Sequence, residues 1–160
     1  MPRNAQINGL GGEPVVNAEV DIWQADDDGL YDVQCPELGD IRRARMHTDA
    51  NGHLKFRTVV PTPYAVPTDG PVGAMLLATG RHPWRPAHLH FRIRAEGYST
   101  LITHIFKEPD LYLDSDAVFG ARSSLIGEFV EHPAGTAPGG AKLDRRYFTL
   151  DQQVCWPRLE

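Results

Sequence analysis

The sequence predicts a mainly β protein, a two-sheet β-sandwich with long Gly/Pro-rich loops and little helix. Its 160 residues have the length of one ordinary domain, so residues 1–160 are expected to form a single unit. The 15 glycines and 13 prolines divide the chain into many short segments, which favours strands and loops over long helices. Several of these segments alternate polar and apolar residues, the period of a strand that buries one face.

The expected strands follow one another along the chain with turn residues between them. Each alternates or forms a short apolar run: residues 18–23, 54–60, 72–78, 88–95, 100–106 and 145–154. The run at 72–78 is consistent with a strand buried on both faces. The prolines between 61 and 71 frame an extended loop around Tyr64. Only residues 123–130 look weakly helical.

Composition narrows the class of partner. The net charge of −5 argues against nucleic acid or anionic lipid as the main ligand. No apolar run reaches the roughly 18 residues that a membrane helix needs, and the first residues lack the apolar region of a signal peptide. Cys35 and Cys155 are too few for a disulfide framework, so we expect free thiols in a reducing cytoplasm.

A pair of histidines gives the first chemical signal. His88 and His90 lie two apart in a predicted strand, so both imidazoles point to one face with Cα atoms about 7 Å apart. The opposite face carries Leu89, Phe91 and Ile93, which places the histidines outside the core. In a chain with seven histidines such a pair also arises by chance, so surface histidines remain an alternative.

The residues alone leave several ways to complete a metal site. Two histidines with a carboxylate suit Fe(II), and two histidines with a cysteine or a carboxylate suit Zn(II). A cupin-like enzyme would use His88, His90 and Glu96, although Glu96 falls in the turn after the strand. Tyr31 and Tyr64 offer phenolates, hard anionic ligands for Fe(III), but composition favours ordinary packing roles for both. A non-catalytic sandwich module similar to transthyretin would need no metal.

Longer segments resemble a known family. Residues 64–73 and 80–90 are similar to the intradiol aromatic-ring-cleaving dioxygenases, which include the catechol, hydroxyquinol and chlorocatechol 1,2-dioxygenases. The core of the resemblance is Arg-Pro-Ala-His-x-His, whose first histidine follows the proline-framed Tyr64 by 24 residues. Residues 18–25, 29–31, 103–106 and 114–120 extend it over most of the chain.

The resemblance implies an iron enzyme. Tyr31, Tyr64, His88 and His90 would be the four protein ligands of a non-haem Fe(III), with Tyr64 and His90 as the axial pair. The implied activity is that of an oxidoreductase in aromatic catabolism. It would cleave a catechol-type 1,2-dihydroxybenzene with O₂ between the two hydroxylated carbons and release a cis,cis-muconate-type diacid.

The resemblance also assigns other roles. Tyr64 would leave the metal as a phenol and take a substrate proton, and Arg85 would face the substrate ring and stabilise its developing charge. His104 joins Tyr64 and Arg85 as an expected catalytic residue, because it stands where many family members have a glutamine beside the metal. Ala117 and Val118 match a stretch that lines the substrate pocket.

The sequence departs from the family pattern at its start. Catechol-type members carry an N-terminal helical segment used in dimerisation, and this chain begins almost at the first core strand. The expected partners are a small aromatic diol and O₂. Homo-oligomers stay compatible with the sequence although that segment is absent, and the choice among catechol, hydroxyquinol and chlorinated catechols stays open.

Overall fold

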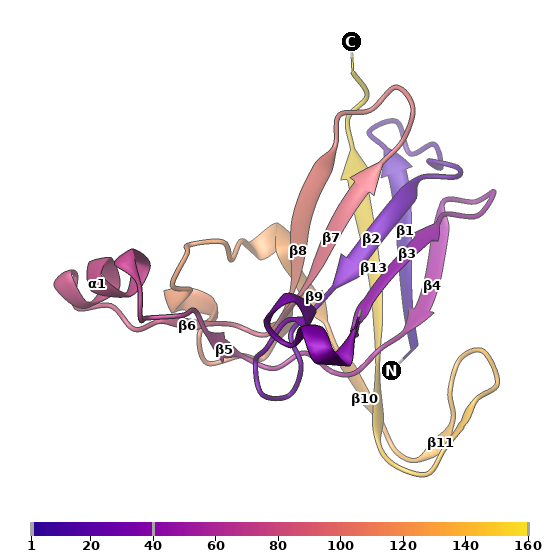
Figure 1. Cartoon of the computed structure of the whole chain (residues 1–160). Helices are drawn as coiled ribbons and strands as arrows, with labels where there is room; N and C mark the ends of the chain where they lie inside the picture. The colour runs from indigo at the N-terminus through magenta and orange to yellow at the C-terminus, as the bar shows by residue number, and fades with distance from the viewer. Residues whose placement is uncertain (1, 40, 160) are drawn as a thin grey trace.

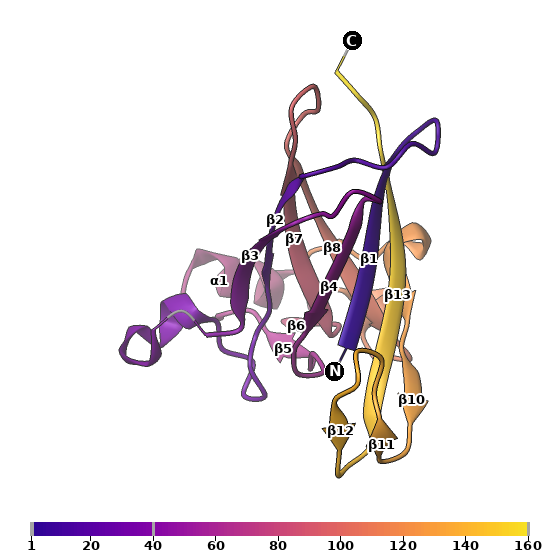
Figure 2. The ribbon, with the colours of Figure 1, turned by 90° about the vertical axis from the view of Figure 1, so that its right-hand side faces the viewer.

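The structure is a computed structural model that describes residues 2–39 and 41–159. It confirms the β-sandwich: Figure 2 shows two sheets as separate layers. The first sheet has the order β10-β13-β1-β4, with β1 at Pro2–Gly9, β4 at His53–Arg57, β10 at Val130–His132 and β13 at Tyr147–Trp156. The second has the order β3-β2-β7-β8-β9, with β2 at Glu19–Trp23, β3 at Arg43–His47, β7 at His88–Arg94, β8 at Leu101–Glu108 and β9 at Ile126–Glu128.

The core lies between the two sheets because each central strand alternates. In β7, Leu89, Phe91 and Ile93 point into the core, as the sequence predicted. The side chains buried with them come from both sheets: Ile7, Val20, Leu54, Ile105, Leu150 and Trp156. The other face of β7 is therefore free to carry polar chemistry.

Short elements fill the loops. The two-residue strands β5 (Tyr64–Ala65) and β6 (Trp84–Arg85) pair with each other, as do β11 (Gly135–Thr136) and β12 (Lys142–Leu143). Single 3₁₀ turns cover Asp32–Gln34, Pro36–Leu38, Leu113–Ser115 and Ser123–Leu125. In Figure 1, β5, β6 and the loops around them lie together below the ends of β7 and β8.

The expectation of a buried strand at 72–78 is wrong, because these residues form helix α1 (Pro71–Ala78). Proline at the first helical position is compatible with a helix start, and the alanine, leucine and methionine that follow are good helix formers. The helix stands apart from the sandwich in Figure 1, and Met75 and Leu77 are 66% and 77% exposed. A short apolar run does not by itself distinguish strand from helix.

The expectation of a weakly helical segment at residues 123–130 is also wrong. Only Ser123–Leu125 forms a 3₁₀ turn, and the chain then enters β9 and β10 instead of a helix. Strands β1 and β3 were not predicted. Strand β3 is an edge strand rich in arginine, in which Arg45 pairs with Asp21 and Glu19 of β2 and Arg43 pairs with Asp32.

Two further expectations concern the environment of the chain. Cys35 and Cys155 are free thiols in the structure. Within the described residues, no helix has the length and apolar character that a membrane crossing requires.

Candidate metal centre

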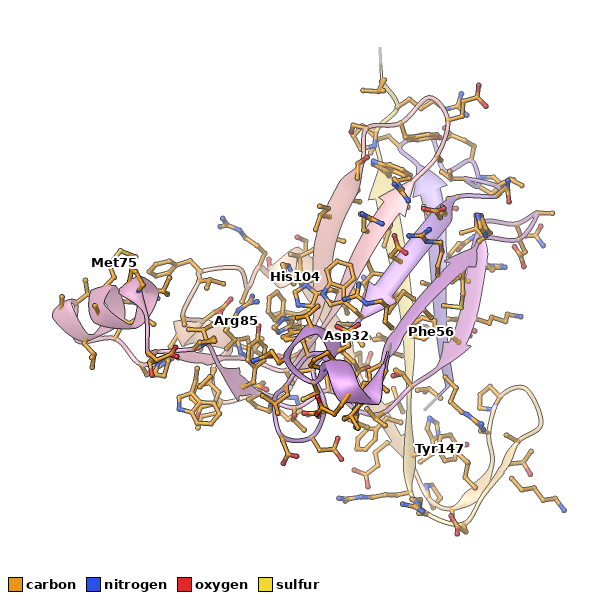
Figure 3. All side chains as sticks on the ribbon, viewed as in Figure 1. Asp32, Phe56, Met75, Arg85, His104 and Tyr147 are labelled. Atoms are coloured by element: carbon orange, nitrogen blue, oxygen red, sulfur yellow. The ribbon has the colours of Figure 1, made fainter. Side chains whose placement is uncertain are left out.

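Three histidines gather at one end of the β7–β8 pair. His88 and His90 come from β7, and His104 of β8 lies directly opposite His90 in the antiparallel register. The Nε2 atoms of His88 and His90 are 3.1 Å apart, and ligand nitrogens of all three residues lie within 4.8 Å of one another. Figure 3 shows His104 and Arg85 close to each other at this end of the sheet.

The hydrogen bonds of His88 define its tautomer. Its Nδ1 lies 2.6 Å from the carbonyl oxygen of Pro86, which can only accept, so Nδ1 carries the proton and Nε2 a lone pair. Burial and the nearby Arg85 charge lower the pKa of His88 to about 3, while burial and His88 lower the pKa of His90 to about 2. Both imidazoles are therefore neutral near pH 7, the form that binds metal.

A tight loop after β2 positions Tyr31. The carboxylate of Asp26 accepts the backbone N–H groups of Asp28 and Leu30, at 3.0 and 2.8 Å, and so closes the turn that precedes the tyrosine. The Tyr31 hydroxyl then lies 2.9 Å from Nε2 of His90. The loop thus brings a phenol to the histidine pair from a segment 59 residues away in sequence.

Tyr64 reaches the same place from the proline-framed loop. Tyr64 of β5 pairs with Arg85 of β6, and Arg85 lies three residues before His88 in the sequence. Gly29 has a φ of +81°, and a Cβ there would be 2.6 Å from the Cβ of Tyr64, so the two loops approach closely only because this residue is glycine. The rings of Tyr31 and Tyr64 meet edge to face at 5.3 Å.

Arg85 is held by a buried carboxylate. Its Nε and Nη2 donate to the two oxygens of Asp116 at 3.0 and 3.3 Å, and its Nη1 donates to Nε2 of His88 at 3.2 Å. Arg85 and Asp116 are only 5% and 3% exposed. Burial opposes both charges, yet their mutual hydrogen bonds outweigh it and keep the pKa of Arg85 above and that of Asp116 below the ordinary value.

The donor set fits a trivalent iron. Two phenol oxygens and two neutral imidazole nitrogens face one small volume, and the ring of Tyr64 lies 5.3 Å from that of Tyr31 and 5.6 Å from that of His88, between centroids. Burial and the neighbouring Tyr64 raise the pKa of the Tyr31 phenol. A cation among these oxygens would reverse that effect, since a nearby positive charge favours the phenolate.

The remaining predicted residues lie at different distances from this cluster. The ring of His104 is 4.5 Å from that of His90 and 5.2 Å from that of His88, between centroids. Ala117 is buried, and its backbone N–H donates to the carbonyl oxygen of Trp84 at 3.1 Å. Val118 is exposed, and its N–H donates to Asp116. Ala117 and Val118 therefore adjoin the Arg85–Asp116 pair.

Glu96 does not join the site. It is exposed in the turn beyond β7, where it lines a separate pocket with Pro14, Val16 and Arg158. Strand β7 ends at Arg94, four residues or about 13 Å beyond His90 at the usual rise, and Glu96 follows two residues later in the turn. The cupin-like ligand set of His88, His90 and Glu96 is thus not formed.

Sequence reasoning missed two residues that support the site. Trp23 stacks on His90 with centroids 4.7 Å apart and planes 7° apart, and together with Tyr31 and Tyr64 it lines a pocket of about 220 Å³. Trp23 ends a predicted strand and pairs with His90 in the register, a signal visible only once strand pairing is known. Asp116 lies in a segment that was matched to the family, but nothing marked it as the partner of Arg85.

Comparisons with known proteins agree with this geometry. A family model described as "Dioxygenase" matches residues 3–147. The chain is 54% identical over 133 residues to 6-chlorohydroxyquinol 1,2-dioxygenase of Cupriavidus pinatubonensis, covering 82% of this chain and 48% of that protein. It is 49% identical over 139 residues to hydroxyquinol 1,2-dioxygenase of Nocardioides simplex, covering 86% and 47%. The chain thus spans about half the length of the curated relatives it matches.

Solved structures give the same result. Hydroxyquinol 1,2-dioxygenase from Pseudomonas putida superposes with a TM-score of 0.88 at 41% identity, covering 99% of this chain and 56% of that one. Catechol 1,2-dioxygenase from Pseudomonas arvilla gives a TM-score of 0.91 at 31% identity, covering 100% and 52%. The likeness therefore extends over the whole sandwich and its loops.

Proposed function

Because the chain belongs to the intradiol dioxygenase family, we propose that it cleaves a catechol-type 1,2-dihydroxybenzene with O₂ between the two hydroxylated carbons. The product would be a cis,cis-muconate-type diacid. One observation carries the proposal: Tyr31, Tyr64, His88 and His90, from three separate segments, converge on one small volume with Arg85 at its edge.

We propose that these four residues hold a non-haem Fe(III). An ion bound there would supply a Lewis acid to which both diol oxygens could bind, and this would make the ring reactive toward O₂. The pocket beside Trp23 and Tyr31 is small, at about 220 Å³, and the stacked Trp23 ring shields His90 from water on that side. The protein residues would orient the diol, accept its protons and stabilise the charge that develops on its ring.

Tyr64 and Arg85 would act on the substrate itself. The Tyr64 oxygen, which would be a phenolate as a ligand, could take the proton of one diol hydroxyl and so become a phenol. Arg85 keeps its charge at any working pH because Asp116 is bonded to it, so it can stabilise negative charge that moves onto the ring. The two hydrogen bonds to Asp116 fix the direction from which the guanidinium faces the site.

The names of the relatives suggest the first substrates to test. Those most similar in sequence include proteins named for hydroxyquinol and 6-chlorohydroxyquinol, so we propose hydroxyquinol-type diols ahead of catechol. The physiological partners would be the diol and O₂, with neither nucleic acid nor a membrane involved. Two free thiols are consistent with a cytoplasmic location.

The test combines colour, metal content and turnover. Protein purified with iron should show a broad visible band from phenolate-to-Fe(III) charge transfer, consume O₂ with hydroxyquinol or catechol, and form a ring-opened diacid. Metal analysis, absorption spectra and an oxygen electrode measure these three properties. A colourless protein that holds stoichiometric zinc and no iron after expression in iron-supplemented medium would contradict the proposal.

A further inference from the structure

A third imidazole adjoins the histidine pair that the proposed iron site uses. His104 lies across the β7–β8 ladder from His90, and one ring nitrogen of each histidine lies within 4.8 Å of the others. The proposed iron set does not include His104. Its ring contacts are His88, His90 and Phe106, at centroid distances of 5.2, 4.5 and 5.6 Å. An imidazole placed there is a potential ligand outside the proposed iron set.

We propose that His88, His90 and His104 form a three-histidine site for a divalent transition metal, with Zn²⁺ as its representative. This site overlaps the proposed iron site through two shared ligands and does not use the tyrosines. The two metals would therefore exclude each other, and the zinc form would be colourless. The inference does not rest on the proposed dioxygenase activity.

The distances fit zinc with a small adjustment. Zinc–nitrogen bonds of 2.0–2.1 Å in a tetrahedral site put ligand nitrogens about 3.3 Å apart. The Nε2 atoms of His88 and His90 are already 3.1 Å apart. The third nitrogen needs to move by at most about 1.5 Å from the 4.8 Å limit, which a rotation of the His104 ring supplies. Three histidines with an open fourth position are a known zinc arrangement.

Ligand chemistry separates the two ions. Phenolates are hard anions that suit Fe(III), whereas neutral imidazoles suit zinc and other divalent ions. A glutamine at position 104 would offer only a weak amide donor, so the extra zinc affinity is specific to the histidine. Arg85 donates to Nε2 of His88 and must release that bond in either metal form, but Asp116 retains the guanidinium through two further hydrogen bonds.

The experiment measures zinc binding directly. The full chain, freed of metal, is titrated with ZnCl₂ in competition with a chromogenic chelator of known affinity. Wild type should bind one Zn²⁺, and His104→Gln should weaken zinc binding by about 10- to 100-fold or more. Loss of a residue that only hydrogen-bonds to a metal ligand already weakens metal affinity by that factor, and His104 would be a ligand itself. Tyr64→Phe should change zinc affinity less than about threefold while altering the colour of the iron form.

The matched control is His132→Gln, which removes a histidine of β10 that bonds Thr149 outside the cluster and should leave zinc affinity unchanged. Circular dichroism shows whether each variant is folded. X-ray absorption of the wild-type zinc form needs no variant and should count three imidazole nitrogens. Two imidazoles with a phenolate oxygen, or equal zinc affinity in wild type and folded His104→Gln, would overturn the three-histidine site. Neither result would affect the iron proposal, which the visible band tests separately.

Discussion

At the scale of single residues, Arg85 separates catalysis from metal binding. It is a partner of His88 and Asp116 but not one of the proposed ligands. We expect Arg85→Ala to keep iron content and the visible band near wild type while turnover falls roughly 10²- to 10³-fold, the usual effect of removing one preorganised electrostatic donor. Arg85→Lys should recover only part of the rate, because an ammonium cannot reproduce the two bonds to Asp116.

Steady-state kinetics with metal analysis decides between the roles of Arg85. Loss of iron in Arg85→Ala would make the residue structural. Unchanged turnover would mean that charge stabilisation at the ring does not come from this guanidinium.

The tyrosines supply a second prediction at this scale. Tyr31→Phe and Tyr64→Phe should each shift or bleach the visible band of the iron form, because each removes one phenolate. Tyr112→Phe and Tyr147→Phe are the controls: Tyr112 stacks on Trp84 with centroids 5.4 Å apart, and Tyr147 donates to the carbonyl oxygen of Thr136 in β11. Absorption spectra at equal iron content provide the measurement. A bleached Tyr112→Phe would show that the first ligand has been assigned to the wrong tyrosine.

The predictability of the site also varies by residue. Strand alternation was enough to place His88 and His90 on the face opposite Leu89, because a strand has a fixed period of two. The proposed tyrosine ligands came from family resemblance, since nothing local marks Tyr31 as different from a packing residue. Asp116 was missed because a contact over 31 residues depends on the folding of two loops, which no periodicity encodes.

At the scale of elements, Gly29 limits how the two tyrosine loops meet. A Cβ at this position would collide with Tyr64 Cβ at 2.6 Å, and its φ of +81° is unfavourable for any other residue. Gly29→Ala should therefore lower the free energy of unfolding by about 1–3 kcal/mol and also change the visible band as Tyr64 is displaced.

Gly12→Ala is the matched control for Gly29→Ala. Gly12 has a φ of +86°, and a Cβ added there would meet no atom within 4 Å, so only backbone strain applies and the band should stay unchanged. Denaturant unfolding and absorption spectra measure both properties. Equal effects of the two variants on the band would refute the loop contact.

Element type was predictable where alternation was clear and unreliable where it was not. Strands β2, β4, β7, β8 and β13 were expected from their period, but the apolar run at 72–78 formed an exposed helix. The expectation that residues 72–78 form a buried strand rested only on their hydrophobicity, which does not distinguish a strand from a helix. Strand β3 was not predicted because Arg43 and Arg45 make its sequence look like an exposed polar segment. In the structure Asp32 pairs with Arg43 and Asp21 pairs with Arg45, so the strand accommodates both charges.

At the scale of the whole molecule, strand β7 joins stability to function. One face of it fills the core with Leu89, Phe91 and Ile93, and the other presents His88 and His90 to the site. The core therefore fixes the positions of the two histidines, and their burial beside it removes the water that would stabilise their charged forms. The same arrangement that makes them ready ligands makes the fold sensitive to acid.

This coupling predicts acid destabilisation of the metal-free protein. The folded-state pKa values of His88 and His90, about 3 and about 2, lie far below the ordinary value of 6.5. Below pH 6.5 these two histidines become protonated in the unfolded chain but stay neutral in the folded chain. Their contribution to the free energy of unfolding is therefore complete above pH 6.5 and is lost as the pH falls toward the folded-state pKa values. Between about pH 5.5 and 4.5 the two groups together should lower the free energy of unfolding by up to about 2.7 kcal/mol per pH unit. His90→Gln should reduce this slope by about 1.4 kcal/mol per pH unit, and denaturant unfolding at several pH values measures the change. A slope equal to that of wild type would show that His90 is protonated in the folded protein.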